Sequence, residues 1–156
     1  MRSDPIILIA SDHAGVELKS QLITRLAAWE WEDLGPAIQD PSRVDYPDYA
    51  EKLTQKITTG QARRGILICG SGIGMSIAAN KAKGIRAALV ENPIAARLSR
   101  EHNDCNVLCL GSRFLAPEYA AEIAEVWLKA NFSQDARHQA RINKIAALEE
   151  KIEGKI

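Results

Sequence analysis

One segment of the sequence combines a thiol, a hydroxyl and three glycines at alternate positions. An apolar run precedes this segment and a helical pattern follows it, so we predict a buried parallel strand, a glycine-rich turn and the start of a helix. Glycines let backbone N–H groups approach a ligand closely, and a helix N-terminus favours bound anions. We therefore interpret the turn as a candidate site for an oxyanion. Its residues are Cys69, Gly70, Ser71, Gly72, Ile73 and Gly74.

Cys69 lies where the predicted strand ends, close to the start of the predicted helix. A thiolate is stabilised in such a position, so Cys69 is a candidate base or nucleophile near neutral pH. The alternative is an ordinary glycine-rich connection, because the segment matches neither GxxxxGK[ST] nor the usual dinucleotide fingerprint. The segment alone leaves a catalytic and a purely structural role open.

Apolar runs alternate with helical patterns along the whole chain. Strands are predicted at residues 6–10, 32–34, 65–69, 86–90 and 106–110. Helices are predicted at residues 15–31, 47–59, 93–101, 117–131 and 136–151, with a further helix starting in the glycine turn. This alternation predicts an α/β fold: a Rossmann-like three-layer sandwich around a five-stranded parallel sheet in the order 2-1-3-4-5. We expect a single domain over residues 1–156.

Several polar residues follow the predicted strands or precede their helices. In such a sheet the ligand lies beyond the carboxyl ends of the strands, where the strand order reverses, which brings Asp12 and His13 beside Cys69. Asp12 could instead cap the next helix, and His13 could be a solvated loop residue. Arg113 follows the fifth strand and belongs to the same edge. Tyr46 precedes the second predicted helix and either lines a pocket or packs against that helix.

The last predicted helix has apolar residues but no strand to cover, so we expect it to dock on a partner subunit. Arg137 and Arg141 lie four residues apart on this helix and could grip a phosphate together, unless they form a solvated basic face. His102 lies in a polar patch at the end of an earlier helix, where a histidine usually answers the negative end of the helix dipole.

The composition restricts the class of partner and the compartment. The chain has 156 residues, of which 46% are hydrophobic and 26% charged, and its formal net charge is zero. Without a basic excess we expect no nucleic-acid partner, and no apolar run is long enough for a membrane span or a signal peptide. The three cysteines form no CxxC pair, which indicates free thiols in the cytoplasm and argues against structural zinc.

Six segments carry a family resemblance. They are SDHAG, DYPDYA, GILICGSGIGMSIAANK, GIRAALV, LSREHNDCNVLCLGSR and ARHQARI. Together they resemble ribose-5-phosphate isomerase type B, in the wider group of galactose-6-phosphate and allose-phosphate isomerases. The resemblance implies interconversion of ribose 5-phosphate and ribulose 5-phosphate through a cis-enediolate, without metal or cofactor. Because Cys69 is present and Met75 cannot take a proton, the chain matches the cysteine branch of this group.

The resemblance also implies roles for individual residues. The expected catalytic residues are Cys69, Ser71, His102 and Asp12. The expected substrate-binding residues are His13, Tyr46, Gly70, Gly72, Ile73, Gly74, Asn80, Asn103, Arg113, Arg137 and Arg141. Cys69 would be the base, Ser71 the proton relay and His102, with Asp12, the group that opens the sugar ring. Relatives share each site across a dimer, so a homodimer or a tetramer is expected, with His102 and the tail arginines supplied by the second subunit.

Three other functions stay open. The same chemistry could act on a six-carbon substrate such as allose 6-phosphate or galactose 6-phosphate, since pocket depth decides. A nucleotide-binding regulatory module would use the glycine turn for phosphate, but no acidic residue ends a clear second strand, because Leu34 follows Asp33 directly. A cysteine hydrolase would pair Cys69 with His102, although no groove for an acyl substrate is indicated.

Overall fold

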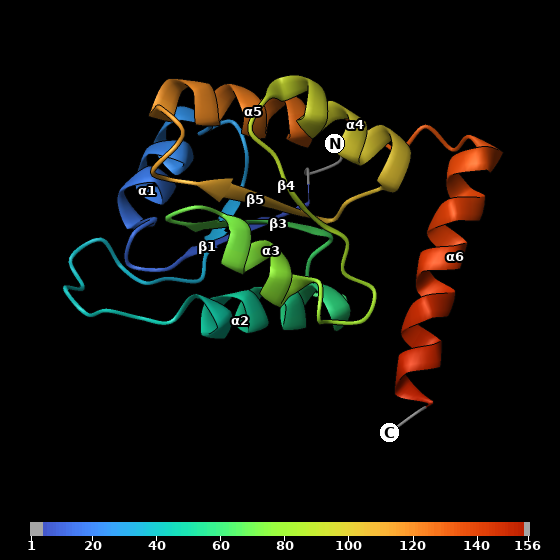
Figure 1. The fold of residues 1–156 in the computed structure, drawn as a ribbon. Coiled ribbons are helices and arrows are strands. Elements are labelled where there is room, and N and C mark those ends of the chain that lie inside the picture. Colours follow the sequence, from blue (N-terminus) through green and yellow to red (C-terminus); the bar gives the residue numbers. More distant parts are fainter. Residues whose placement is uncertain (1–4, 155–156) are drawn as a thin grey trace.

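The computed structural model describes residues 5–154 as three layers (Figure 1). The strands are β1 (Ile7–Ser11), β2 (Trp31–Asp33), β3 (Arg64–Cys69), β4 (Ala87–Leu89) and β5 (Val107–Gly111). The helices are α1 (Val16–Arg25), α2 (Tyr46–Thr58), α3 (Ile73–Ala79), α4 (Pro93–Asn103), α5 (Pro117–Lys129) and α6 (Ala136–Glu153). The predicted α/β sandwich with a parallel five-stranded sheet is confirmed. Among the boundaries, α1 ends earlier than predicted and α4 extends further.

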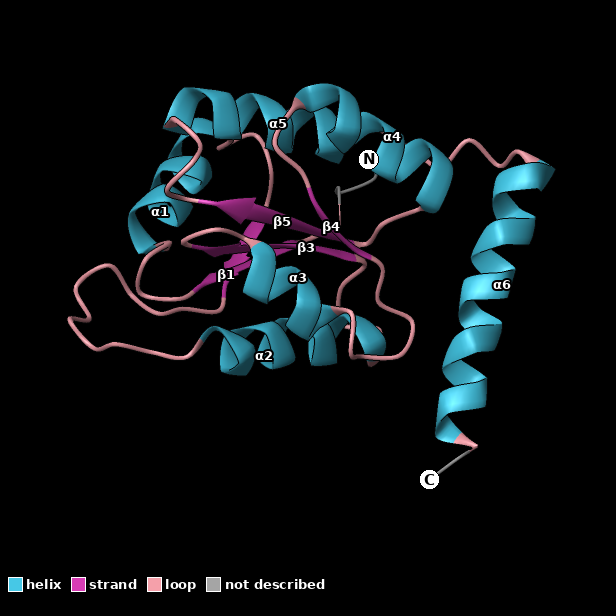
Figure 2. Cartoon of the chain, viewed as in Figure 1, coloured by secondary structure: helices cyan, strands magenta, loops and turns pink. Residues whose placement is uncertain are grey.

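Two apolar cores lie on the two faces of the sheet, because side chains alternate along each strand. Ile7 and Ile9 of β1 face the core that α1, α4 and α5 cover. Leu8 and Ala10 face the core that α2 and α3 cover, as the layers in Figure 2 show. Each buried isoleucine or leucine contributes roughly 1.5–3 kcal/mol, so both helix layers are held against the strands that carry the candidate site.

The sheet order is β2-β1-β3-β5-β4, so the predicted order 2-1-3-4-5 is wrong for the last two strands. β5 pairs with β3 from Val107 to Gly111, and all five of its residues are buried. β4 has three half-buried residues, which suits a sheet edge. The chain steps outward to β4 and back to β5, so right-handed crossovers put α3 and α4 on opposite faces. The strand order still reverses between β1 and β3, as the sequence predicts.

α4 extends to Asn103, two residues beyond its predicted end. The helix begins after Asn92, whose side chain accepts a hydrogen bond from the Ala95 N–H at 2.8 Å. Asp104 ends it in the left-handed conformation, with φ of 45°. The extension places His102 in the last turn of α4, so its imidazole is presented by a helix rather than by a loop.

α6 stands beside the sandwich instead of covering the sheet (Figure 1). Near its end, Lys83 pairs with Glu150 at 2.6 Å and with Glu153 at 2.9 Å. The backbone N–H of Gly84 donates to the carboxylate of Glu149 at 3.1 Å. These contacts attach the C-terminal half of α6 to the loop between α3 and β4.

An apolar stripe on α6 is exposed in the single chain. Its residues are Ile145, Leu148 and Ile152, which are 41%, 57% and 66% exposed. Their spacing of three and four residues puts them on one side of the helix. Within residues 5–154 no helix combines the length and the apolar character that crossing a membrane would require.

Candidate active site

The carboxyl ends of three neighbouring strands are joined to one another by backbone hydrogen bonds. After β1, the N–H of Asp12 donates to the carbonyl of Ile68 in β3 at 3.0 Å. After β5, the N–H of Ser112 donates to the carbonyl of Cys69 at 2.9 Å. The structure thus brings Asp12, Cys69 and Arg113 to one edge of the sheet, at the predicted reversal of strand order.

The turn after β3 depends on Gly72. This residue has a left-handed φ of 75°, and a Cβ there would lie 2.6 Å from Leu89 Cδ1 and 2.9 Å from the carbonyl carbon of Leu110. Only glycine fits without strain. The conformation points the Gly72 N–H at the Sγ of Cys69, 3.1 Å away. α3 has only seven residues. Negative charge in the turn is therefore stabilised by the backbone N–H groups of the turn more than by the dipole of a long helix.

The three cysteines have different surroundings. Cys69 is 4% exposed and its sulfur accepts the hydrogen bond from Gly72. Burial raises the pKa of Cys105 to about 11, and burial also raises the pKa of Cys109, which is fully buried in β5. Cys105 and Cys109 are therefore protonated at neutral pH, whereas an N–H donor faces the sulfur of Cys69.

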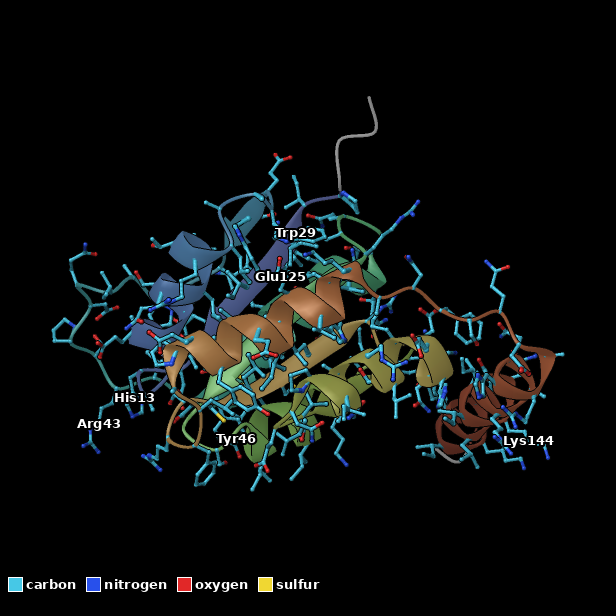
Figure 3. All side chains as sticks on the ribbon, turned by 90° about the horizontal axis from the view of Figure 1, so that it is seen from above. His13, Trp29, Arg43, Tyr46, Glu125 and Lys144 are labelled. Carbon is cyan, nitrogen blue, oxygen red and sulfur yellow. The ribbon has the colours of Figure 1, made fainter. Side chains whose placement is uncertain are left out.

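A guanidinium group and an aromatic ring flank the glycine turn. A Cβ on Gly70 would lie 2.9 Å from Cζ of Arg113, and a Cβ on Gly74 would lie 2.5 Å from Cζ of Tyr46. Both glycines therefore let a larger side chain pack directly on the turn. Figure 3 shows the labelled Tyr46 and His13 at the same end of the molecule. Tyr46 is 39% exposed, so its ring also borders solvent.

Asp12 and His13 occupy the loop after β1. Asp12 is 7% exposed, and its Oδ1 accepts hydrogen bonds from the N–H groups of Ala14 at 2.9 Å and Gly15 at 3.2 Å. Asp12 therefore organises this turn and lies at the site edge as well, although Gly15, not Asp12, is the residue at the helix cap. His13 is exposed, and its Nδ1 lies 3.1 Å from the carbonyl oxygen of Val44.

Ser71 and Asn80 lie at opposite ends of α3. The Oγ of Ser71 accepts a hydrogen bond from the Ile73 N–H at 3.2 Å, which keeps the hydroxyl in the turn. Asn80 follows the last residue of α3, and its side chain pairs with the N–H and carbonyl of Ala87 at 2.8 and 2.9 Å. The side chain of Asn80 is therefore committed to the start of β4, away from the turn where the sequence interpretation puts it.

His102 and Asn103 lie at the other end of the sheet. They form the last turn of α4, just before the amino end of β5. Cys69 pairs in register with Gly111, the last residue of β5. The length of β5, about 15 Å at ~3.3 Å per residue, therefore separates the two positions along the strand direction. Within one chain His102 therefore does not reach Cys69, and the expectation that a second subunit supplies His102 stays a prediction.

The arginines of α6 belong to the His102 end of the molecule. Arg137 and Arg141 are exposed, and Figure 3 shows Lys144 of the same helix far from His13. Between the two arginines, His138 is 6% exposed and its ring centroid lies 4.1 Å from that of His102. The sequence interpretation passes over His138. Its spacing of four from buried Ile142 is the signal that could have found it.

The ribose/galactose isomerase family model matches residues 7–145. The chain belongs to this family. The ribose-5-phosphate isomerase B of Escherichia coli (strain K12) is 41% identical over 145 residues, which cover 93% of this chain and 97% of the relative. A Mycoplasma pneumoniae relative called probable ribose-5-phosphate isomerase B is 49% identical over 151 residues, 96% of this chain and 98% of the relative.

Solved structures of the ribose/galactose isomerase family agree with the fold. Ribose-5-phosphate isomerase B of Clostridium thermocellum superimposes with a TM-score of 0.89 at 44% identity, covering 94% of this chain and 99% of that one. The Mycoplasma genitalium enzyme with bound ribulose-5-phosphate gives a TM-score of 0.85 at 44% identity, with 93% and 96% covered. The resemblance drawn from the six sequence segments is confirmed.

Proposed function

We propose that the chain is an aldose–ketose isomerase that interconverts ribose 5-phosphate and ribulose 5-phosphate. The observation that carries the proposal is the sulfur of Cys69, which lies at the carboxyl end of β3 and 3.1 Å from the amide nitrogen of Gly72. The relatives support this substrate, since the Escherichia coli protein is a ribose-5-phosphate isomerase B and the Mycoplasma genitalium structure contains ribulose-5-phosphate. The proposed unit is one domain over residues 1–156, acting in the cytoplasm without metal or cofactor.

Cys69 is the base in this mechanism. Its thiolate takes the C2 proton of the open-chain aldose, and the electron pair left behind forms the enediolate. The same sulfur then returns the proton to C1, which gives the ketose. A hydrogen-bond donor aimed at the sulfur stabilises the thiolate, and the Gly72 N–H has that position.

The glycine turn supplies the electrostatic part of catalysis. The Gly72 and Ile73 N–H groups donate to Cys69 and Ser71, so the other N–H groups between Gly70 and Gly74 hold the oxygens of the enediolate. One well-placed donor contributes roughly 3 kcal/mol. Isomerisation also moves a hydroxyl proton from O2 to O1. Ser71, whose Oγ stays in the turn, relays this proton. Asn80 takes no part, because its amide pairs with Ala87.

The phosphate is held by basic side chains around the same edge. Arg113 packs on Gly70 and His13 follows β1, so both can reach an anion at the mouth of the turn. A planar guanidinium suits phosphate because it donates two parallel hydrogen bonds. Tyr46 closes one side of this space by packing on Gly74.

The remaining groups come from a second copy of the chain. His102 of the second copy opens the sugar ring, assisted by Asp12, which lies beside Cys69 in the first chain. Asn103 of the second copy binds the substrate, and its Arg137 and Arg141 bind the phosphate. In one chain His102 lies about 15 Å along the strands from Cys69. A partner that docks on the exposed apolar stripe of α6 would complete each site with its own residues. We infer a homodimer with two shared sites; pairing of dimers into tetramers is compatible with this arrangement.

Removal of the thiol tests the base. Cys69→Ala should lower kcat for ribose 5-phosphate in a coupled assay by about 10³-fold, with binding of ribulose 5-phosphate, measured by calorimetry, largely intact. Cys105→Ala is the matched control, because Cys105 is a buried cysteine outside the turn. Full activity of Cys69→Ala would remove the cysteine from the mechanism. Comparing kcat/KM for ribose 5-phosphate, allose 6-phosphate and galactose 6-phosphate tests the sugar length.

Mixed dimers test the shared site. Cys69→Ala and His102→Ala proteins should each be nearly inactive. If the two proteins are unfolded together and refolded, random pairing should restore about a quarter of the wild-type activity, because each heterodimer then has one intact site. Mass spectrometry would confirm that heterodimers form. Heterodimers without recovered activity would contradict the shared site.

A further inference from the structure

A second histidine lies directly against His102. The ring centroids of His102 and His138 are 4.1 Å apart and their planes are tilted by 37°. The two rings differ in accessibility, since His102 is exposed at the end of α4 whereas His138 is 6% exposed on α6. The buried ring of His138 therefore packs against the exposed imidazole of His102 and supports it.

The ring of His138 is held by the segment that joins α5 to α6. Its Nδ1 lies 3.0 Å from the Oγ of Ser133. The N–H of Ser133 donates to the carbonyl of Glu101 at 3.0 Å, so this segment is attached to the last turn of α4 itself. The Ser133 Oγ also accepts a hydrogen bond from the Asp135 N–H at 3.3 Å. His138 and His102 are thus positioned by one connected set of contacts.

The two ring nitrogens of His138 have different partners, and these partners determine which nitrogen carries the hydrogen. Nε2 lies 3.5 Å from Nη2 of Arg137, and a guanidinium can only donate, so Nε2 offers its lone pair. Nδ1 then carries the hydrogen and donates to Ser133. Burial lowers the pKa of His138, and the nearby His102, Arg137 and Arg141 lower it further against the opposing effect of Asp135. The buried ring is neutral, so His102 can carry a proton without a second imidazolium against it.

We propose that His138 is a positioning residue, which fixes the neighbouring imidazole of His102 in the orientation that delivers a proton to the sugar ring oxygen. This inference rests on the proposed function and adds a residue to it. His138 contacts both Arg137, a phosphate ligand in the proposal, and His102, the ring-opening acid. His138 therefore links Arg137, which binds the phosphate, to His102, which donates the proton.

Only one of the two substrates needs its ring opened. Comparing them therefore distinguishes a role of His138 in ring opening from a role in the reaction as a whole. Ribose 5-phosphate is a furanose, and its opening needs a proton on the ring oxygen as the bond to C1 breaks, while the anomeric hydroxyl loses its proton. Ribulose 5-phosphate is acyclic, because the oxygen that would close its ring carries the phosphate. Exchange of its C1 proton with solvent needs Cys69 but no ring opening.

His138→Ala should therefore slow isomerisation of ribose 5-phosphate by about 10- to 100-fold. Exchange of the C1 proton of ribulose 5-phosphate in D2O, followed by NMR, should stay near the wild-type rate. His102→Ala should show the same separation of the two rates, and adding His138→Ala to it should cause little further loss. Gln139→Ala is the matched control, because this exposed neighbour on α6 bonds to Asn143 instead.

Several outcomes would overturn the inference. Equal loss of both reactions in His138→Ala would indicate lost phosphate binding or folding, and no loss would indicate a passive side chain. If His138→Ala fails to assemble, Ser133→Ala decides, because it keeps the ring and removes the bond to Nδ1; an unchanged ratio of the two rates then refutes the inference. Wild-type protein inactive in both reactions would instead refute the proposed function.

Discussion

Replacing Gly72 by alanine should damage the fold at the turn that holds Cys69. The new Cβ would lie 2.6 Å from Leu89 Cδ1 and 2.9 Å from the carbonyl carbon of Leu110, on a backbone with φ of 75°. The left-handed conformation costs roughly 1–2 kcal/mol for a non-glycine residue, and the overpacking adds about 1–3 kcal/mol. We expect the free energy of unfolding, measured by urea denaturation, to fall by ~2–5 kcal/mol.

The same substitution should also slow catalysis. Relief of the two close contacts must shift the turn, and the Gly72 N–H then leaves its place 3.1 Å from the Cys69 sulfur. A hydrogen bond to a charged group contributes roughly 1.5–3 kcal/mol, so loss of this donor to the thiolate should lower kcat by about 10- to 100-fold. A coupled assay of ribose 5-phosphate isomerisation measures this loss.

Gly60→Ala is the matched control for Gly72→Ala. Gly60 has a left-handed φ of 78°, but a Cβ there meets no heavy atom within 4 Å. It should therefore show only the backbone cost of roughly 1–2 kcal/mol and unchanged kcat. If Gly72→Ala matched Gly60→Ala in both stability and kcat, the close packing of the turn would have no catalytic importance, and the reasoning would be refuted.

Iodoacetamide should alkylate Cys69 in the folded protein before Cys105 or Cys109, because burial raises the pKa of the latter two, to about 11 for Cys105. Peptide mass spectrometry measures the order, and equal labelling would contradict it. Asp33→Ala should destabilise the protein by about 2–4 kcal/mol, more than Lys19→Met at about 1–2 kcal/mol. The reason is that Asp33→Ala leaves the Lys19 ammonium, 2% exposed and 2.6 Å from Asp33, without its counterion. Urea denaturation of both variants tests this order.

The layers of the fold and the edge that carries Cys69 follow from patterns visible in the sequence. The continuous apolar runs that end at Ala10 and Leu110 are typical of parallel strands buried on both faces. Their alternation with helices fixes the direction of every connection. The placement of Asp12 beside Cys69 needs only the reversal between β1 and β3, and that reversal does not depend on the order of β4 and β5.

The order of β4 and β5 and the contacts of α6 were beyond sequence reasoning. Swapping two adjacent strands keeps every local pattern intact, and only the shorter, half-buried β4 favours the edge position. His138 reads as one polar residue between two arginines, because its contact with His102 joins segments 36 residues apart. Lys19 appears as a surface residue of α1, but its ammonium reaches the Pro36 carbonyl at 2.6 Å. Such contacts depend on loop paths, for which periodicity carries no information.

The most direct test of the account is whether Cys69 itself carries hydrogen between C1 and C2. Ribulose 5-phosphate incubated in D2O with wild-type protein should acquire deuterium at C1, followed by proton NMR. Cys69→Ser should lower that exchange rate by about 10³-fold while the sugar phosphate still binds. Exchange at the wild-type rate in Cys69→Ser, with Cys69→Ala behaving alike, would contradict the central claim.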